Sequence, residues 1–358
     1  MSNLREPAFA GYAEMERLAR EGAWFAFSCS AGKDSAAAML HATRYLDTWG
    51  HPKSRRFVIH ADLGRSEWKS TKTHVEYLAA FFGLPLQIVA HKTHDMLSRW
   101  QRRGDLGRQR WAAYETLRLI GPWSSSSSRF CTSEMKGHVM GAVKAKLDGP
   151  VVSVLGLRRD ESIGRRATPI VKPDTSMGRF GRRQDDFIWN PIAEWSAQDV
   201  FAAHEAAGLA LHEAYPLGAT RLSCNFCVLA SINDLTVASG HLDNHETYRE
   251  LVAMECSYGF AFQPSRWLGD VAPSLLSTGL QRDLTGAKRH AEERRSIEAA
   301  YPVGMTTKPY SAITRADAEI VAQGRARIAE SYRICDAVID PAVIASLHCA
   351  NVQGKEKA

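Results

Sequence analysis

Apolar and polar stretches alternate along the first part of the chain in the order expected for strands followed by helices. The apolar run WFAFSCS (24–30) predicts a buried strand, and an alanine-rich stretch through about Tyr45 predicts the helix after it. RRFVIHAD (55–62) and PLQIVAH (85–91) predict two more strands, separated by the helical pattern of residues 67–83. This alternation is typical of right-handed βαβ units, so we expect an α/β fold with an open parallel sheet flanked by helices.

The strand pattern resumes later in the chain. VVSVLGLRRDES (151–162) and FIWNPIAEW (187–195) predict further strands, and the glycine- and arginine-rich stretch between them, 163–186, is expected to be a loop or lid by its composition. Beyond the helical pattern SAQDVFAAHEAAG (196–208), the sequence predicts a mostly helical C-terminal portion.

A basic, aromatic segment at about 96–128 interrupts the alternation. Such a mixture suits phosphate contacts and base stacking, and an exposed helical hairpin with apolar anchors produces the same pattern. We therefore expect a nucleotide-binding domain over 1–215, with this segment as an insertion, and a mostly helical region with a cysteine site over 216–358. The residues in question are Arg99, Arg102, Arg103, Arg108, Arg110 and Arg118 with Trp100, Trp111 and Tyr114.

Composition adds little to this picture. The 358 residues are 45% hydrophobic and 23% charged, as in ordinary globular proteins, and the formal net charge of +6 is compatible with an anionic partner without requiring one. No apolar run approaches the roughly 20 residues that span a bilayer, so no membrane association is expected. The N-terminal stretch is charged and lacks an apolar signal region, so we expect a cytoplasmic protein. The oligomeric state stays open.

The first strand-to-helix connection, SAGKDS (30–35), carries the clearest candidate chemistry. Small residues at this place let backbone N–H groups and the helix N-terminus face an anion. Lys33 would add positive charge, Ser30 and Ser35 hydroxyl donors, and Asp34 either a Mg²⁺ ligand or an anchor for the loop. The spacing fits neither the Walker loop nor G-x-G-x-x-G. A turn of small residues with an incidental lysine is the plainer alternative.

This loop resembles the S-G-G-x-D-S signature of the PP-loop ATP pyrophosphatases, with Ala31 replacing the first glycine. Further segments resemble, in order, blocks of the phosphoadenylyl-sulfate (PAPS) reductase family within that class, and the resemblance covers about residues 23–230. These segments are HADLGRSEWKST (60–71), RFCTSEMK (129–136), GLRRDESIGRR (156–166) and NPIAEWSAQDVF (190–201).

The resemblance implies a Rossmann-like fold that binds ATP with Mg²⁺. The reaction that it implies is attack on the α-phosphate, which gives an adenylated substrate and pyrophosphate. Lys33, Asp34 and Arg158 are the expected catalytic residues, and the backbone near Asp62 and Gly64 is expected to read adenine. The full nucleotide-binding set is Ser30, Gly32, Lys33, Asp34, Ser35, Asp62, Gly64, Gly156 and Arg158.

Further arginines follow Arg158. Arg159, Arg165 and Arg166 are expected to serve a second anion or the substrate. A solvated cluster paired with Asp160 and Glu161 is the alternative.

The cysteines suggest a metal centre. Cys224 and Cys227 form a C-x-x-C, Cys131 lies in the Arg-x-Cys-Thr block, and Cys256 is the best remaining candidate for a fourth ligand. Related sulfur-handling proteins carry a [4Fe-4S] cluster bound in this way, which we favour over zinc. A redox pair or buried thiols would also fit the pattern. Cys29 and Cys335 are expected to be structural.

The C-terminal end differs from the reductases. Their tail supplies a nucleophilic cysteine in E-C-G-[LI]-H, whereas here Cys349 stands in SLHCANVQ without that motif. The leading hypothesis is therefore ATP-dependent adenylation coupled to sulfur transfer, with a nucleic acid as acceptor, as in DNA phosphorothioation or tRNA thiolation. A cysteine desulfurase or another sulfur-donor protein would be the partner. The alternatives are a reductase of adenylyl sulfate or its 3′-phosphorylated form, and a non-catalytic nucleotide-binding subunit.

Overall fold

The computed structural model describes residues 9–181, 185–306 and 313–355. The chain divides into two compact units. The sheet unit comprises Met1–Met96 and Arg129–Asn244, and the helical unit comprises Leu97–Ser128 and His245–Ala358. Part of the N-terminal stretch considered for targeting, residues 1–8, lies outside the described residues.

This division differs from the one that the sequence suggested. The basic segment packs with the C-terminal helices instead of forming an insertion in the sheet unit, and the sheet unit continues to Asn244 instead of ending at 215. The physical reason is burial, since the aromatic residues of the segment contribute to the core of the helical unit.

The sheet unit is built on six strands in the order β3-β2-β1-β4-β6-β5. All neighbouring strands pair in parallel except β5 and β6, which are antiparallel. The α/β fold class with a mostly parallel sheet is thus confirmed. The strands are β1 (Trp24–Ser28), β2 (Arg56–Asp62), β3 (Leu86–Ala90), β4 (Val151–Val154), β5 (Val171–Pro173) and β6 (Phe187–Trp189).

Strand β5 corrects one expectation. The stretch 163–186 was expected to be a loop or lid, but Val171–Pro173 pairs with β6 in antiparallel register. This strand ends in a proline at the edge of the sheet, where a missing N–H is tolerated, and it is only three residues long. So short a strand leaves almost no periodic signal in the sequence.

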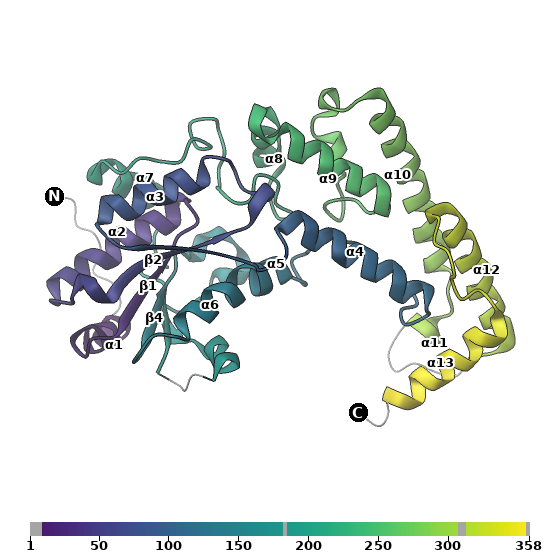
Figure 1. Cartoon of the computed structure of the whole chain (residues 1–358), viewed down its shortest axis with the longest axis horizontal. Helices are drawn as coiled ribbons and strands as arrows, with labels where there is room; N and C mark the ends of the chain where they lie inside the picture. The colour runs from purple at the N-terminus through teal and green to yellow at the C-terminus, as the bar shows by residue number, and fades with distance from the viewer. Residues whose placement is uncertain (1–8, 182–184, 307–312, 356–358) are drawn as a thin grey trace. The chain divides into compact units, whose positions relative to one another are not determined.

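Helices cover the two faces of the sheet (Figure 1). On one face, α6 (Val139–Lys144) packs on β2 and β3, beside a core cluster of Ala26, Phe57, Ile59 and Val151. On the other, α2 contacts β1 and β4, and α3 contacts β2. Besides α6, the helices of the sheet unit include α1 (Phe9–Arg20), α2 (Lys33–Thr48), α3 (Thr71–Phe82), α7 (Ala197–Ala207) and α8 (Ile232–Gly240).

Local sequence signals explain where these helices start and stop. Ser196 and Asp199 form a reciprocal capping box at the start of α7, and Gly208 ends that helix in the left-handed region. Gly83 ends α3 in the same way, with φ of 62°.

The sheet order creates a switch point at β1. The chain runs from β1 outward through β2 and β3, then returns to place β4 on the other side of β1. Open α/β sheets bind ligands in the crevice outside the carboxyl ends of strands at such a point. The connection after β1 and the connection after β4 meet there.

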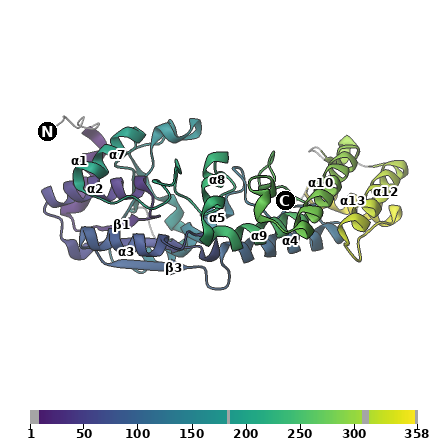
Figure 2. The same cartoon turned by 90° about the horizontal axis from the view of Figure 1, so that it is seen from above.

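The helical unit consists of α4 and the C-terminal helices (Figure 2). Trp100 and Trp111 of α4 are fully buried, and Tyr114 is 4% exposed. These rings are therefore core residues and are not available for base stacking, which supports the structural alternative for the basic segment. The helices are α4 (Met96–Ala112), α9 (His245–Tyr258), α10 (Thr278–Ala299), α11 (Val303–Thr306), α12 (Arg315–Tyr332) and α13 (Pro341–Lys355).

Across the described residues, every helix is too short or too polar to cross a membrane.

Candidate nucleotide site

The loop after β1 folds tightly onto the start of α2. Ala31 adopts φ of 61°, in the left-handed region that glycine tolerates best. The Ser35 hydroxyl donates to the Gly32 carbonyl at 2.8 Å and accepts the Ser30 N–H at 3.3 Å. The loop is thus closed by its own hydrogen bonds, with the N-terminus of a 16-residue helix behind it.

Asp34 is held by two cations. Its Oδ1 lies 2.6 Å from Arg158 Nε, and its Oδ2 lies 3.1 Å from Lys33 Nζ. Arg158 also pairs with Asp160. Both carboxylate oxygens are therefore engaged, so in this structure Asp34 anchors the loop to the segment after β4. Its role as a Mg²⁺ ligand stays a prediction.

Lys33 is enclosed instead of facing an open pocket. Its ammonium donates to the Thr220 carbonyl at 3.2 Å and lies near the rings of Phe201 and Tyr215. The Tyr215 hydroxyl accepts the Lys33 N–H, and His204 Nε2 faces the Lys33 carbonyl oxygen, each at 2.9 Å. Its side chain is 4% exposed and does not line the pocket described below. Contact between Lys33 and phosphate stays a prediction.

Gly156 makes the closest approach to the loop. A Cβ atom at this position would lie 2.4 Å from the Asp34 carbonyl oxygen and 2.5 Å from the Ser35 nitrogen. Only glycine lets the chain after β4 pass against the first turn of α2. Gly156 therefore lies against the Ser30–Ser35 loop, and its contact with a nucleotide stays a prediction.

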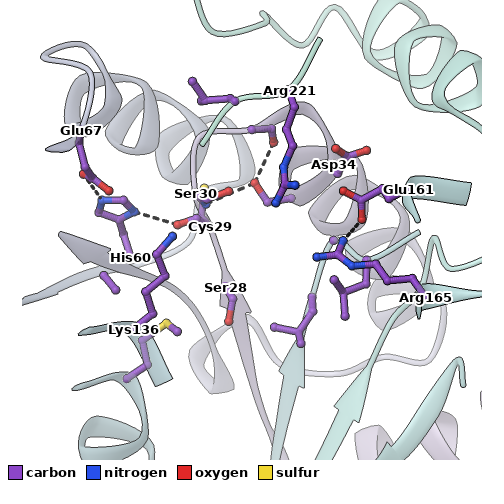
Figure 3. Close-up of a pocket in the computed structure, with 18 residues that line it drawn as sticks. Ser28, Cys29, Ser30, Asp34, His60, Glu67, Lys136, Glu161, Arg165 and Arg221 are labelled. Atoms are coloured by element: carbon purple, nitrogen blue, oxygen red, sulfur yellow. Dashed lines mark hydrogen bonds and ion pairs between the residues drawn. The ribbon is translucent and has the colours of Figure 1, made fainter. Parts of the chain in front are cut away.

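A pocket of about 250 Å³ opens above this loop (Figure 3). Ser30, Gly32, Asp34, Ser35 and Gly156 from the expected set line it. Three cations also line it, namely Arg165, Lys136 and Arg221. Figure 3 shows His60 and Lys136 on one side of the pocket and Arg165 and Arg221 on the other.

Sequence reasoning gave no role to Lys136 or Arg221. Lys136 ends the RFCTSEMK block and lies in a π-helical turn, Ser133–His138, that leads into α6. Such turns are frequent at functional sites, but they have no sequence signature. Arg221 stands three positions before the C-x-x-C, and only the tertiary structure brings it to the pocket.

His60 also lines the pocket and was given no role from the sequence. Its Nδ1 lies 2.8 Å from the Cys29 carbonyl oxygen, and its Nε2 lies 3.1 Å from Glu67 Oε2. Burial alone would lower the pKa of His60, but the hydrogen bond and charge of Glu67 raise it above its ordinary value. The pocket wall therefore favours a charged imidazole.

The expected adenine-reading residues form a turn beside the pocket. Asp62 Oδ1 accepts the Gly64 N–H at 2.7 Å, and Gly64 has φ of 67°. A Cβ at Gly64 would lie 2.6 Å from Asp95 Cβ. Neither residue lines the pocket, whereas the neighbouring Ala61 does. Adenine contact stays a prediction.

The arginines expected to serve a second anion separate in the structure. Arg165 lines the pocket and pairs with Glu161. Arg159 pairs with Glu194 at 2.9 Å and donates to the Thr168 carbonyl, and Arg166 is exposed. Of the three, only Arg165 is therefore a pocket residue.

Cys131 and Cys227 are electrostatic neighbours of Cys224 in the sheet unit. Burial raises the pKa of Cys224 to about 12, nearby Lys136 lowers it, and the charges of Cys227, Glu67 and Cys131 raise it further. This donor set suits a soft metal centre. Over residues 9–181, 185–306 and 313–355, however, no group of three or more His, Cys, Asp or Glu side chains has metal-binding geometry.

The remaining cysteines belong to other segments of the chain. Cys256 belongs to α9 of the helical unit, and its electrostatic neighbours Glu255, Asp283 and Lys288 come from that unit. Cys29 is buried, as suits a structural residue, whereas Cys335, also expected to be structural, is exposed. Cys335 follows α12, which ends at Tyr332.

Comparisons with known proteins show the family of the chain. The family model of the phosphoadenosine phosphosulfate reductase domain matches residues 25–230. The "Uncharacterized 37.8 kDa protein in gpa 5′region" of Escherichia phage 186 is 28% identical over 246 residues, with 58% of this chain and 68% of the phage protein covered. A PAPS reductase structure from Candida auris, a phosphate complex, matches with a TM-score of 0.37 and 14% identity, over 62% of this chain and 97% of that chain. Because the family model spans more than half of the sequence, the chain belongs to the phosphoadenosine phosphosulfate reductase family.

Proposed function

We propose that this protein is a PP-loop enzyme that adenylates an acceptor with ATP and Mg²⁺ and prepares it for sulfur transfer, with a nucleic acid as the acceptor. The observation that carries the proposal is the closed Ser30–Ser35 loop at the N-terminus of α2, in a pocket that three cations line. Such a loop offers backbone N–H donors to phosphate. The cations would neutralise the charge that develops on the phosphates in the transition state.

The proposed reaction consists of an adenylation followed by a sulfur transfer. An oxygen of the acceptor attacks the α-phosphorus of ATP, the bond from that phosphorus to the bridging oxygen breaks, and pyrophosphate leaves with the electron pair. A persulfide of a cysteine desulfurase or another donor protein then attacks the adenylated acceptor, and AMP leaves with the acceptor oxygen. A second thiol, from a protein or a small-molecule reductant, then cleaves the resulting disulfide bond, so that the sulfur stays on the acceptor. Positioning and charge stabilisation account for this type of catalysis.

We also propose a cysteine-bound [4Fe-4S] cluster, with zinc as the alternative. Cys131, Cys224 and Cys227 would hold it, and Cys256 is the proposed fourth ligand. Bound iron and sulfide would supply a site for sulfur or electron exchange. The thiols require a reducing compartment, which the cytoplasm offers.

Cofactor content is tested without any activity assay. Protein purified anaerobically should be brown and contain about four irons per chain. Cys224→Ala and Cys227→Ala should lose the iron, with Cys335→Ala as the matched control. Stoichiometric zinc without visible absorption would replace the cluster by a zinc site. Full iron retention in Cys256→Ala would remove that residue from the set.

The adenylation itself is tested by pyrophosphate release. The assay compares ATP alone with ATP plus DNA or tRNA, with and without a sulfur donor. Release that depends on the acceptor and falls in the Ser30→Ala/Ser35→Ala double variant is the expected result. ATP binding without adenylate or pyrophosphate under any of these conditions would instead favour a non-catalytic nucleotide-binding subunit.

Because the chain belongs to the phosphoadenosine phosphosulfate reductase family, a reductase is the second candidate function. A reductase would release sulfite from adenylyl sulfate or its 3′-phosphorylated form and would need a nucleophilic thiol. Cys349 on α13 is exposed and would be that thiol. Efficient sulfite release that Cys349→Ser abolishes would establish the reductase and refute the adenylating enzyme.

A further inference from the structure

We infer that the segment 212–222, here called the strap, blocks the nucleotide site of the free protein and has to release the Ser30–Ser35 loop before a nucleotide binds. The strap lies between α7 and α8 and contains neither helix nor strand. The inference names a form of regulation for the site described above. It rests on the proposed function for the identity of the ligand.

The Tyr215 hydroxyl of the strap occupies a donor that a phosphate would need. It accepts the Lys33 N–H at 2.9 Å, at the start of α2, and the Leu222 N–H at 3.4 Å. Gly32, the residue before α2, supplies no side-chain cap, so the hydroxyl that caps this helix comes from a residue 182 positions further along the chain. Free N–H groups at a helix N-terminus are the groups that bind phosphate oxygens. The hydroxyl and a phosphate therefore compete for the same N–H group.

The Lys33 side chain and two aromatic rings hold the strap in place. The Lys33 ammonium donates to the Thr220 carbonyl at 3.2 Å. It lies 5.4 Å from the centre of the Tyr215 ring and 5.7 Å from the centre of the Phe201 ring. These two rings meet edge to face, with their centres 6.1 Å apart. The strap is thus packed against the start of α2 by side-chain contacts as well as by the hydroxyl.

The strap and the loop are in van der Waals contact, which leaves no room for a phosphate between them. A Cβ atom at Gly32 would lie 3.6 Å from the Tyr215 hydroxyl oxygen and 3.8 Å from Leu222 Cβ. Arg221 and Leu222 of the strap also line the adjacent pocket, whose volume of about 250 Å³ is below the roughly 300–1,000 Å³ of most ligand pockets. Displacement of the strap would widen this pocket and free the Lys33 N–H in one movement.

Nucleotide affinity tests the strap separately from turnover. The ligand is the α,β-methylene analogue of ATP with Mg²⁺, which cannot release pyrophosphate, and calorimetry measures its binding. Tyr215→Phe keeps the ring and removes the hydroxyl. Tyr248→Phe is the matched control, because the Tyr248 hydroxyl accepts the Ala272 N–H at the same distance of 2.9 Å, within the helical unit.

We expect Tyr215→Phe to bind the analogue roughly three- to tenfold more tightly than the wild type. Without the hydroxyl, the Lys33 N–H of the free protein lacks its partner, and the phosphate of the analogue supplies one. The apparent affinity also rises with the fraction of molecules in the open state. Phe201→Leu, which removes one of the packed rings, should strengthen binding by a smaller factor, and Tyr248→Phe should match the wild type.

Hydrogen exchange of the strap amides provides a second measurement. In the wild type, the analogue should speed exchange in peptides that cover 212–222, because binding releases the strap. The same peptides should already exchange faster in Tyr215→Phe without ligand.

Two results would overturn the inference. Weaker or unchanged binding by folded Tyr215→Phe would show that the hydroxyl does not oppose the nucleotide. Unchanged or slower exchange of the strap when the analogue is added would show that the strap stays in place or closes over the ligand. Acceptor-dependent pyrophosphate release together with either result would leave the proposed function intact. Tighter binding by Tyr215→Phe, in a protein that releases no pyrophosphate with any acceptor, would refute the proposed function and leave the strap.

Discussion

Arg158 Nε lies 2.6 Å from Asp34 Oδ1, with both side chains largely buried. This ion pair joins the first turn of α2 to the segment after β4, across the switch point of the sheet. Gly156, two positions before Arg158, makes room for that approach. The geometry of the Ser30–Ser35 loop therefore depends on a residue more than a hundred positions away in the sequence.

Removing one partner of this pair should destabilise the protein strongly. Arg158→Met leaves a buried carboxylate with Lys33 as its remaining partner, so we expect the free energy of unfolding to fall by about 3 kcal/mol. Asp34→Asn combined with Arg158→Met should cost less than the sum of the two single changes, since neither charge of this pair is then left without the other. Urea denaturation in a double-mutant cycle measures this coupling, and strictly additive losses would show that the pair contributes nothing.

Lys136 and Lys33 should respond in opposite ways to the same substitution. Lys136 lines the pocket and has no ion-pair partner among the described residues, so Lys136→Met should weaken ATP binding about tenfold and leave unfolding nearly unchanged. Lys33 is buried against Asp34, so Lys33→Met should lower the free energy of unfolding by about 3 kcal/mol. Calorimetry and urea denaturation on both variants separate the two effects. The reverse pattern would restore Lys33 as the phosphate-binding lysine.

Gly156 should not accept a side chain. A Cβ introduced at this position would press on backbone atoms of Asp34 and Ser35, which cannot rotate away. Gly156→Ala should therefore lower the free energy of unfolding by about 2 kcal/mol and abolish ATP binding. Gly164→Ala is the matched control, because a Cβ there meets no atom within 4 Å. Thermal denaturation measures the stability and calorimetry measures ATP binding. Wild-type stability and ATP affinity of Gly156→Ala would contradict the close contact of Gly156 with Asp34 and Ser35.

Ala31 should gain stability on conversion to glycine. A left-handed conformation costs a non-glycine residue about 1–2 kcal/mol, more than the roughly 0.4–1 kcal/mol of additional unfolded-state entropy that glycine brings. Ala31→Gly should therefore raise the free energy of unfolding by about 0.5–1 kcal/mol and preserve ATP binding. Ala42→Gly, within α2, should lower it by about 1 kcal/mol. A destabilised Ala31→Gly protein would indicate that the loop adopts another conformation.

Acid should weaken the sheet unit through buried histidines. Burial lowers the pKa of His212 to about 4, and its neighbours include His74, Glu213 and His241. In the unfolded chain His212 takes up a proton near pH 6.5, whereas in the folded protein it stays neutral until the pH approaches 4. The contribution of His212 to the free energy of unfolding is therefore complete above pH 6.5 and is lost as the pH falls towards 4. For one such group, the free energy of unfolding changes by at most about 1.4 kcal/mol per pH unit.

Denaturation at pH 7 and pH 5 measures this dependence. His212→Gln should reduce the difference between the two conditions. Some difference should remain in the variant, because burial lowers the pKa of His41 to about 4 as well. An unchanged pH dependence would show that His212 titrates equally in both states.

The sequence alone determined the sheet strands other than β5, the loop at Ser30–Ser35 and the family. These features are local: an apolar run next to small residues specifies a strand, a turn and a helix start through backbone preferences and periodicity. The family resemblance of the segment 156–166 pointed to Gly156 and Arg158, which follow a predicted strand.

Only the tertiary structure decided which side chains face the pocket. Lys33 stands in the motif, yet Tyr215, His204 and Thr220 enclose it through contacts more than 160 positions away along the chain. Lys136 and Arg221 reach the pocket from segments whose sequence does not reveal their direction. The aromatic residues of 96–128 suggested a binding surface, but they are buried, because periodicity shows that a helix has an apolar face and not what covers it.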